Sequence, residues 1–394
     1  MTLEDCVRNV DDEYIVAVRR ELHMRPEIGF DLPETLAKVK NELGKMGIPF
    51  SEEYGKSSLV ADINGGCKNY TIGIRADMDA LPIHETNDVP YRSQIPGRMH
   101  ACGHDAHTAM LLGTAKALKA AEDRLACRVR LLFQACEEGE LSGARLMVED
   151  GVMDEIDIII GLHVENWLES GSIGVCPGPS MAASHPIKIV FHGKAAHATL
   201  PQTGHDALAM AVKTYNGIQA MLAREIDPFA RYVCSVGTLN AGKAVNIIAD
   251  YAEMKLTLRT FDTDLEKCIV DRIKLLSANA AAELGGTSEV LDETKALPVI
   301  NHPLLSSLVL QSAEKVLDKD RIVHMPVKMS SEDFSFYLGK KPGVFFRLGT
   351  RNEAKDCTTL PHNDNFMIDE DALGTGSRVC VQFVLDHMHG INLE

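Results

Sequence analysis

The chain has 394 residues, more than the roughly 250–300 at which a single hydrophobic core usually stops growing, so two domains are expected. Hydrophobic residues make up 45% of the chain, enough for sizeable cores, and 40 Lys and Arg against 56 Asp and Glu give a formal net charge of −16, which disfavours nucleic acid and anionic lipid as partners. The acidic N-terminus has no apolar leader segment and no stretch of about 18 apolar residues occurs, which predicts a cytoplasmic protein with no membrane partner.

Hydrophobic periodicity in the first half predicts alternating helices and strands. Helices are expected over residues 10–24, where Pro26 ends the pattern, over 33–46, closed by Gly47, and over 108–121. Strands are expected over 71–74, 129–133 and 156–161. Strands that alternate with helices form βαβ units, so this part predicts an α/β domain whose central mixed sheet is mainly parallel, with helices on both faces.

The pattern changes after Pro186. Strands at 187–191, 232–239, 249–260 and 288–291 and helices at 206–223 and 264–284 follow in the order β-α-β-β-α-β, a split-βαβ sandwich. Helices at 304–317 and 369–388 and a strand at 343–348 then resume the first pattern. We therefore predict a discontinuous catalytic domain of residues 1–184 and 297–394 and an inserted α+β domain of residues 185–296.

The ten cysteines are scattered rather than spaced as in a disulfide scaffold, so most are expected to be reduced and buried. Cys102 is different, because the segment HACGHDAH at 100–107 holds three histidines, one cysteine and one aspartate directly before a predicted helix. Imidazole and thiolate are zinc ligands, so Cys102 and His104 are candidate metal ligands. The alternative is a helix start capped by Asp105 with solvated histidines, since Asp is a favoured N-cap.

Polar clusters also follow three predicted strands: Asp77 and Asp79 the first, Glu137 and Glu138 the second, and His163 the third. The carboxyl ends of strands line the ligand crevice of an open α/β sheet, so these clusters are expected to converge. Adjacent glutamates at a strand end can diverge, one to bind metal and the other to exchange protons with the attacking water. For the two aspartates, support behind the ligand histidines is favoured over direct ligation or turn formation.

The segment 349–364 is the main stretch without periodicity. It is polar and contains His362, and loops of this kind carry functional sites more often than cores do. A solitary histidine such as His163 or His362 is more often structural than metal-binding. The residues alone therefore leave these two ligand assignments open.

Taken together, these segments resemble the M20 metallopeptidase family, in its aminoacylase-like branch of hippurate hydrolases, auxin-conjugate amidohydrolases and N-acetyl-diaminopimelate deacetylases. The likeness spans nearly the whole chain. It is carried by RRELHMRPEIGF from Arg19, GIRADMDALPI from Gly73, HACGHDAHTAMLLG from His100, FQACEEGE from Phe133, GLHV from Gly161, MAAS from Met181, GKAAHATLP from Gly193, KMSSEDFSFY from Lys328 and PGVFFRLGT from Pro342.

The resemblance implies two divalent metal ions per subunit, with zinc favoured and manganese, cobalt and nickel as alternatives. It implies that Cys102 bridges the two ions and that Glu137 is the general base and acid. The remaining implied ligands are His104, Glu138, His163 and His362. Behind the ligands we expect three supporting aspartates: Asp77, Asp79 and Asp105.

The resemblance also implies a role for the inserted domain, as a lid and as the dimerisation surface of a homodimer or higher oligomer. In such enzymes this domain supplies a histidine that stabilises the oxyanion, and His197 is the matching residue. It further supplies an asparagine and an arginine near the substrate carboxylate, which match Asn246 and Arg259.

The implied reaction is metal-dependent hydrolysis of the amide bond of a small N-acyl amino acid, such as an acetyl or benzoyl amino acid. Three departures from the family pattern leave the substrate open. The usual proline before Ala-Glu-Glu is missing from QACEE at 134–138, the glycine-rich run after it becomes GELSGA at 139–144, and LPHND at 360–364 leaves His362 as the ligand there. A di- or aminopeptidase, which needs an acidic group for a free ammonium, is the first alternative. A catalytically inactive metal-binding homologue is the second.

Overall fold

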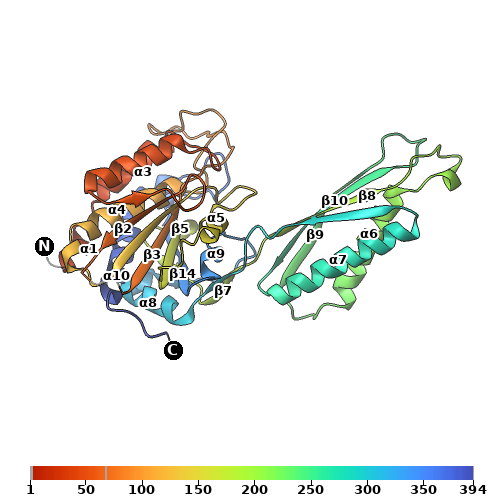
Figure 1. Cartoon of the computed structure of the whole chain (residues 1–394). Coiled ribbons are helices and arrows are strands. Elements are labelled where there is room, and N and C mark those ends of the chain that lie inside the picture. The colour runs from red at the N-terminus through yellow and green to blue at the C-terminus, as the bar shows by residue number, and fades with distance from the viewer. Residues whose placement is uncertain (1–2, 67–68, 394) are drawn as a thin grey trace. The chain divides into compact units, whose positions relative to one another are not determined.

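A computed structural model describes residues 3–66 and 69–393 of the chain, which divide into two compact units (Figure 1). The first unit is formed by residues within 1–180, 300–327 and 333–394, and the second by 181–299 together with 328–332. The chain thus leaves the first unit, builds the second and returns. The short segment 328–332, which the sequence places in the catalytic domain, is grouped with the second unit.

The first unit is built on a large mixed sheet. Its strands are β1 (Phe50–Ser51), β2 (Leu59–Asn64), β3 (Thr71–Asp77), β4 (Arg128–Gln134), β5 (Ile158–Glu169), β6 (Ile173–Val175), β13 (Ile322–His324) and β14 (Gly343–Arg351). Within the described part of the chain they stand in the order β1-β2-β4-β3-β5-β14-β6-β13. The central strands β4, β3, β5 and β14 are parallel, whereas β2 is antiparallel to β4 and β6 to β14. The predicted α/β class is confirmed.

Helices pack against both faces of this sheet (Figure 1). They are α1 (Leu3–Arg8), α2 (Asp12–His23), α3 (Pro33–Met46), α4 (His104–Lys119), α5 (Gly143–Glu149), α8 (Pro303–Ala313), α9 (Ser335–Leu338) and α10 (Leu373–His387). The faces can be told apart at β5, where successive side chains point to opposite sides. Gly161 faces Phe334 beside α9, whereas Leu162 lies close to Gly376 of α10.

Local sequence signals explain several element boundaries. The predicted helix over 33–46 is confirmed, because Pro33 has the fixed φ that suits a first turn and Gly47 takes the left-handed φ of +66° that ends the helix. Every residue of β3 is buried, as expected for a central parallel strand covered on both faces. The apolar runs of the sequence therefore mark the middle of the sheet.

The second unit combines four strands and two helices in its described residues. They are β8 (His185–His192), α6 (Ala207–Arg224), β9 (Tyr232–Ala241), β10 (Tyr251–Thr260), α7 (Thr263–Glu283) and β11 (Thr287–Asp292). The strands form an antiparallel sheet in the order β11-β8-β10-β9, with both helices on one side (Figure 1). Asp206 and Asp262 cap the two helices by accepting backbone N–H groups. Two further short strands, β7 (Gly178–Met181) and β12 (Val299–Asn301), pair with each other, and most of their residues belong to the first unit.

The structure differs from the sequence-based prediction in the extent of β5. The prediction ends this strand at Gly161, but pairing with β14 carries it on to Glu169, so His163 lies within the strand rather than after it. The predicted helix over 304–317 ends at Ala313, and the one over 369–388 begins with a short 3-10 turn. Strands as short as β1, β6 and β13 span too few residues to show a periodicity, so the sequence does not predict them.

The cysteines behave as the sequence predicts. All nine that the structure describes are free thiols, and seven of these are buried. Cys234 is partly exposed and Cys268 is exposed. Cys102 is one of the buried thiols, but its neighbours are polar.

Candidate metal centre

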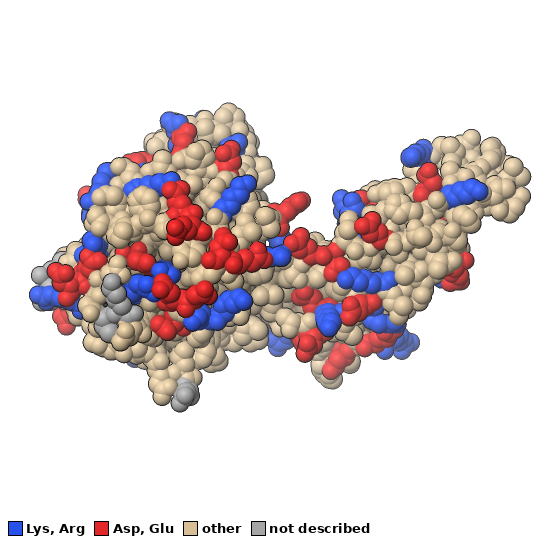
Figure 2. Space-filling model, viewed as in Figure 1, with Lys and Arg blue, Asp and Glu red and all other residues tan. Residues whose placement is uncertain are grey.

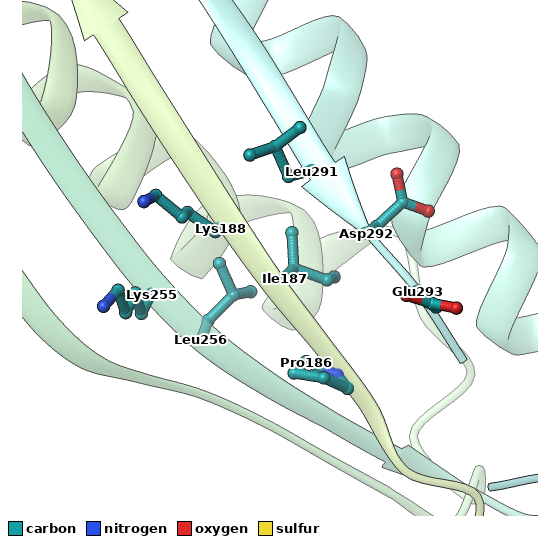
Figure 3. A pocket seen from close by; sticks show the side chains of 8 residues that line it. All are labelled: Pro186, Ile187, Lys188, Lys255, Leu256, Leu291, Asp292 and Glu293. Carbon is teal, nitrogen blue, oxygen red and sulfur yellow. The ribbon is translucent and has the colours of Figure 1, made fainter. Parts of the chain in front are cut away.

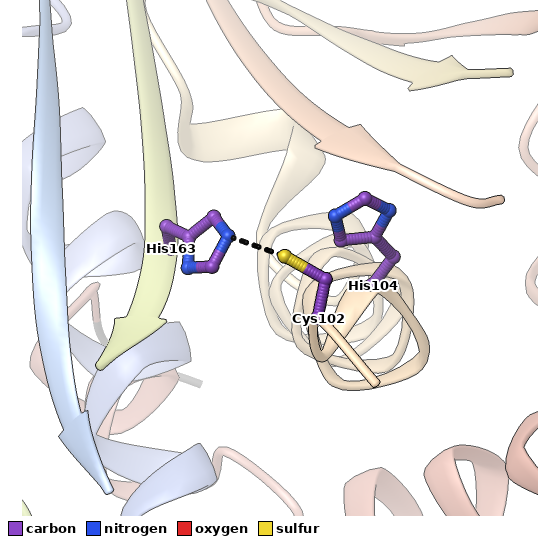
Figure 4. Close-up of side chains that lie close together, drawn as sticks. All are labelled: Cys102, His104 and His163. Carbon is purple, nitrogen blue, oxygen red and sulfur yellow. Dashed lines mark hydrogen bonds between the residues drawn. The ribbon is translucent and has the colours of Figure 1, made fainter. Parts of the chain in front are cut away.

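The candidate ligands meet at one edge of the first unit's sheet. Because β3, β4 and β5 are parallel, the segments that follow β3 and β4 reach the same side of the sheet as the middle of the longer strand β5, which carries His163. The Sγ atom of Cys102, in the loop before α4, lies 3.3 Å from Nε2 of His163 in β5 (Figure 4). His104, the first residue of α4, lies on the other side of Cys102.

Donor atoms of six side chains lie close enough to hold cations. Three overlapping groups each place their donor atoms within 4.8 Å of one another. These groups are Cys102, His104 and His163; Cys102, Glu138 and His362; and His104, Glu137 and Glu138. The structure thus brings together all five predicted ligands and the predicted base. Cys102, His104 and Glu138 are each common to two of these groups.

The backbone conformation of Gly103 sets the direction of the chain between two candidate ligands, Cys102 and His104. Gly103 is the N-cap residue of α4, with a left-handed φ of +89°, and it makes no side-chain capping bond. A Cβ at this position would clash with Cγ2 of Val164. The alternative prediction, a helix start capped by Asp105 with solvated histidines, is wrong: Asp105 lies inside the first turn, and His100, His104 and His107 are buried.

Asp79 contacts both His104, the first residue of α4, and the turn that carries Glu137 and Glu138. Its Oδ1 lies 3.3 Å from Nδ1 of His104 and accepts the backbone N–H of Glu137 at 3.0 Å, while its Oδ2 accepts that of Glu138 at 3.1 Å. The preceding residue, Cys136, adopts a left-handed φ of +55°, which turns the chain so that both N–H groups face one carboxylate. The predicted supporting position of Asp79 therefore has a geometric basis.

His362 reaches the group from a separate loop. Its Nε2 lies 3.0 Å from Oε1 of Glu138, and its backbone N–H donates to the carbonyl of Ala101 at 2.8 Å. Its backbone φ is +66°, an uncommon conformation for a residue other than glycine. The polar segment 349–364, which showed no periodicity in the sequence, thus contacts the loop that carries Cys102.

Burial and neighbouring carboxylates favour the protonated forms of Cys102 and His104. Burial raises the pKa of the Cys102 thiol well above its usual value, and Glu138 and Glu137 raise it further. Burial acts to lower the pKa of His104, but Asp77 and Asp79 outweigh it and raise this pKa to about 10. A divalent cation would replace such protons, because metal ligands bind in their deprotonated forms.

The side chains fit a divalent metal. A thiol, imidazoles and carboxylates form the donor set that zinc and similar cations prefer. The Nε2 atom of His104 is buried and finds no hydrogen-bond partner among the described residues. An unsatisfied buried polar atom costs about 1–3 kcal/mol, a cost that a metal–nitrogen bond would remove.

Asp77 and His107 form a second histidine–carboxylate contact that is better described as support. Nδ1 of His107 lies 2.6 Å from Oδ1 of Asp77, and Nε2 of His107 accepts the backbone N–H of Val164 at 3.0 Å. Although Asp77, His104 and His107 are close enough to hold an ion, both ring nitrogens of His107 are already engaged. Asp77 also pairs with Arg75 at 2.7 Å.

The remaining predicted residues belong to the second unit. His197 is exposed, its Nδ1 lies 2.8 Å from the Thr199 hydroxyl, and its neighbour Ala198 donates a backbone N–H to the carbonyl of Asn246. The structure therefore brings the His197 and Asn246 segments together. Arg259, in β10, donates from Nη1 to Oγ of Ser331 at 2.7 Å.

A separate pocket of about 410 Å³ lies on the open side of the second unit's sheet, with the helices behind it (Figure 3). It is lined by Pro186, Ile187, Lys188, Lys255, Leu256, Leu291, Asp292 and Glu293. None of these is a predicted site residue. Lys188 is already paired with Glu253 at 2.7 Å, so the pocket offers no clear anion site.

The sequence did not reveal two sets of buried charged residues near the candidate metal centre, one around Arg75 and Asp333 and one around Arg19 and His23. Arg75 in β3 pairs with Asp333 at 2.9 Å, and Gln134 donates to the same carboxylate at 2.9 Å. Asp105, predicted to support a ligand, contacts Arg19 and His23 of α2, which the sequence did not single out. The sequence did contain a signal for both sets, because Arg75 stands in the apolar strand β3 and Arg19 stands on the apolar face of α2.

Comparison with known proteins places the chain in a family. Residues 73–386 match the family described as Peptidase family M20/M25/M40. Thermostable carboxypeptidase 2 of Saccharolobus solfataricus is 37% identical over 95% of each chain, and the N-acetyl-L-cysteine deacetylase of Bacillus subtilis is 36% identical over 92% of this chain and 85% of its own. The solved YXEP protein of Bacillus subtilis, a dinuclear metal binding peptidase from the M20 family, has a TM-score of 0.83 at 31% identity, covering 96% of this chain and 99% of its own. The chain therefore belongs to peptidase family M20/M25/M40.

Proposed function

We propose that this chain is a metal-dependent amidohydrolase that cleaves the amide bond of N-acyl amino acids, giving a carboxylic acid and a free amino acid. The observation that carries the proposal is the placement of Glu137 in the same cluster as the thiol, imidazole and carboxylate donors. The similarity to the N-acetyl-L-cysteine deacetylase supports an acylated amino acid as substrate.

Two divalent cations, with zinc favoured over manganese, cobalt and nickel, would be held by the five candidate ligands: Cys102, His104, Glu138, His163 and His362. When bound, they supply Lewis acidity towards the substrate carbonyl oxygen and make nearby water more acidic. Cys102 is the proposed bridging residue, a role that the family resemblance implies; its sulfur lies in two of the donor groups, as do donor atoms of His104 and Glu138.

Glu137 is the proposed general base and acid. Its carboxylate takes a proton from the attacking water as the new C–O bond forms, and delivers that proton to the amide nitrogen as the C–N bond breaks. Asp79 keeps Glu137 and Glu138 on the same turn by accepting both backbone N–H groups. The two neighbouring carboxylates can then have different roles: Glu138 would bind the cation, and Glu137 would accept and donate the proton.

The second unit is proposed as a split-βαβ, ferredoxin-like domain that serves as a lid. His197 would stabilise the oxyanion, a role in which one donor is typically worth about 3–4 kcal/mol. Asn246 and Arg259 would hold the substrate carboxylate, for which the planar guanidinium of Arg259 is suited. These roles rest on the family resemblance and on the proximity of the His197 and Asn246 segments.

We propose that a second copy of the chain binds to this unit to form a homodimer. Strand β9 is an edge strand of its sheet, and beside it α6 exposes an apolar stripe at helical spacing. The stripe consists of Leu208, Val212 and Tyr215. A shallow pocket of about 280 Å³ joins it to β9, lined by Val212, Tyr215, Val236, Gly237, Thr238 and Leu239. Tyr215→Glu should convert a dimer to a monomer, as measured by light scattering after gel filtration.

The surface charges support a small-molecule substrate rather than a nucleic acid. Figure 2 shows acidic and basic side chains interspersed on the face in view, without a continuous basic area. The net charge of −16 acts in the same direction, since it repels phosphate backbones. Among the described residues, no helix is both long enough and apolar enough to span a bilayer.

The decisive experiment measures hydrolysis by protein stripped of metal and reloaded with Zn²⁺, Mn²⁺, Co²⁺ or Ni²⁺. The substrates are N-acetyl and N-benzoyl amino acids, compared with unblocked dipeptides. We expect release of the free amino acid from the acylated set, loss on chelation and a strong loss in Glu137→Gln. The proposal fails if the metal-loaded protein hydrolyses none of the acylated substrates, or if Glu137→Gln acts at the parent rate.

A carboxypeptidase is the second candidate function, favoured by the 37% identity to thermostable carboxypeptidase 2. A carboxypeptidase also cuts an amide whose leaving amine belongs to an amino acid with a free carboxylate, so the same cluster could serve. N-blocked dipeptides separate the two functions. Efficient removal of their C-terminal residue, with slow cleavage of simple acyl amino acids, would favour the carboxypeptidase.

A further inference from the structure

A cluster of charged side chains lies between α2 and the start of α4, apart from the candidate ligands. It consists of three basic residues and three carboxylates: Arg19, Arg20, His23, Glu85, Asp105 and Glu370. Apolar side chains would bury the same volume with a smaller desolvation cost. What ion pairs add is a fixed geometry, because their directions and distances are narrowly defined.

Asp105 connects this cluster to α4. Its Oδ2 lies 2.8 Å from Nε of Arg19 and 2.7 Å from Nδ1 of His23, and all three side chains are at most 2% exposed. The other ring nitrogen of His23 lies 3.2 Å from Oε1 of Glu85. The imidazole is therefore held at both ends, and the carboxylate of Asp105 is held from two directions.

The start of α4 is held by side chains inside its first turns, where His104 contacts Asp79, His107 contacts Asp77 and Asp105 contacts α2. A Ser, Thr, Asp or Asn at the N-cap accepts a backbone N–H of the first turn, but Gly103 has no side chain and makes no such bond. Cys102 and His104 lie on either side of this glycine, so any movement of the first turn would move both candidate ligands. Asp105, one residue further along, is the first side chain of the helix that pairs with α2.

We propose that Arg19 and His23 are positioning residues for the metal centre: by holding Asp105 they fix the start of α4, and with it the relative placement of Cys102 and His104. This inference rests on the proposed metal-binding function. Arg19 and His23 act at a distance, through the helix, and touch neither the cation nor the substrate.

The chain offers a matched control in the neighbouring residue. Arg20 pairs with Glu370, as Arg19 does, and both guanidinium groups lie over the ring of Tyr91. Arg20 is 47% exposed at its side chain, however, whereas Arg19 is buried and contacts Asp105. Arg19→Met and Arg20→Met thus remove the same chemical group beside the same partners, but only the first loosens Asp105.

The experiment is a titration of metal-free protein with Co²⁺, followed in the near-ultraviolet by the thiolate-to-cobalt charge-transfer band. It compares the parent with Arg19→Met, His23→Asn, Arg20→Met and Cys102→Ser. Each protein is measured at a temperature below the midpoint of its own thermal unfolding. Arg19→Met and His23→Asn should weaken Co²⁺ binding by about 10–100-fold, the usual effect of losing support behind a ligand. Arg20→Met should bind as the parent does.

The outcomes separate this inference from the proposed function. If the parent shows no charge-transfer band, or if Cys102→Ser keeps it, the metal site itself fails and the inference falls with it. If the parent shows the band but folded Arg19→Met and His23→Asn bind Co²⁺ as the parent does, only the positioning role is overturned. An equal weakening by Arg20→Met would also overturn it. Should Arg19→Met fail to fold, His23→Asn decides, since it leaves the Arg19–Asp105 ion pair in place.

Discussion

The thiol of Cys102 and the imidazole of His163 lie 3.3 Å apart although 61 positions separate them in the chain. Two atoms of this kind at this distance share either a proton or a cation. Burial raises the pKa of Cys102 and lowers that of His163, so without a metal the proton stays on sulfur and the imidazole is neutral. The pair is thus arranged to exchange one proton for a cation.

Replacing the thiol of Cys102 should therefore weaken metal binding while the protein still folds. Cys102→Ser should lower metal affinity by more than the roughly 10–100-fold that follows loss of a residue behind a ligand. Hydrolysis should fall with it. Calorimetric titration with Zn²⁺ measures the affinity, and Cys268→Ser, at an exposed thiol, is the matched control. Unchanged Zn²⁺ binding in Cys102→Ser would contradict the assignment.

Glu137 should affect the rate without affecting the metal. Glu137→Gln removes the proton acceptor but retains size, and general acid–base catalysis typically contributes about 10²–10⁴-fold, so kcat should fall within that range. Metal content, measured by elemental analysis, should equal that of the parent. Glu140→Gln changes an exposed glutamate of the same segment and should leave both quantities unchanged. Loss of metal in Glu137→Gln would reassign this residue as a ligand.

Gly103 should be intolerant of any side chain. Gly103→Ala combines a left-handed φ with a clash against Val164, so its free energy of unfolding should fall by more than that of Gly97→Ala. Gly97 has a φ of +77° and open space around it, and a left-handed alanine alone costs roughly 1–2 kcal/mol. Urea unfolding of the two metal-free variants gives the comparison. Equal losses would show that the contact with Val164 relaxes at no cost.

His185 should make the second unit less stable as the pH rises. Burial acts to lower its pKa, but Glu266 at 2.7 Å and Asp292 at 3.3 Å outweigh this and raise the pKa above its ordinary value. The folded unit then binds a proton more tightly than the unfolded chain. The stabilisation is complete below a pH of about 6.5 and is lost as the pH rises through the folded-state pKa.

Hydrogen exchange of the backbone amides of β8 and β11 as a function of pH measures this effect within the second unit. His185→Gln should remove the decline in protection, after correction for the intrinsic exchange rate. His192→Gln, at the exposed end of the same strand, should retain it. A decline of equal size in His185→Gln would place the titrating group elsewhere.

The sequence determined the class of the fold and the local part of the site. Continuous apolar runs can only be central strands or buried helices, so the βαβ pattern, the second unit's β-α-β-β-α-β order and the exact span of α3 follow from residue patterns alone. Cys102 and His104 could be selected because their chemistry is concentrated in eight residues, and the adjacent Glu137 and Glu138 because they end an apolar strand.

Only the tertiary structure could decide the contacts between distant segments. His163 and His362 are single residues in unremarkable surroundings. Only the pairing of β5 with β3, the contact of Val164 with His107 and the return of the His362 loop to Ala101 bring them to Cys102. The support behind Asp105 was equally hidden, because an ion pair between residues 19 and 105 leaves no periodic trace in the sequence. Periodicity reports which face of an element is buried, whereas the identity of its partner depends on how the chain folds back on itself.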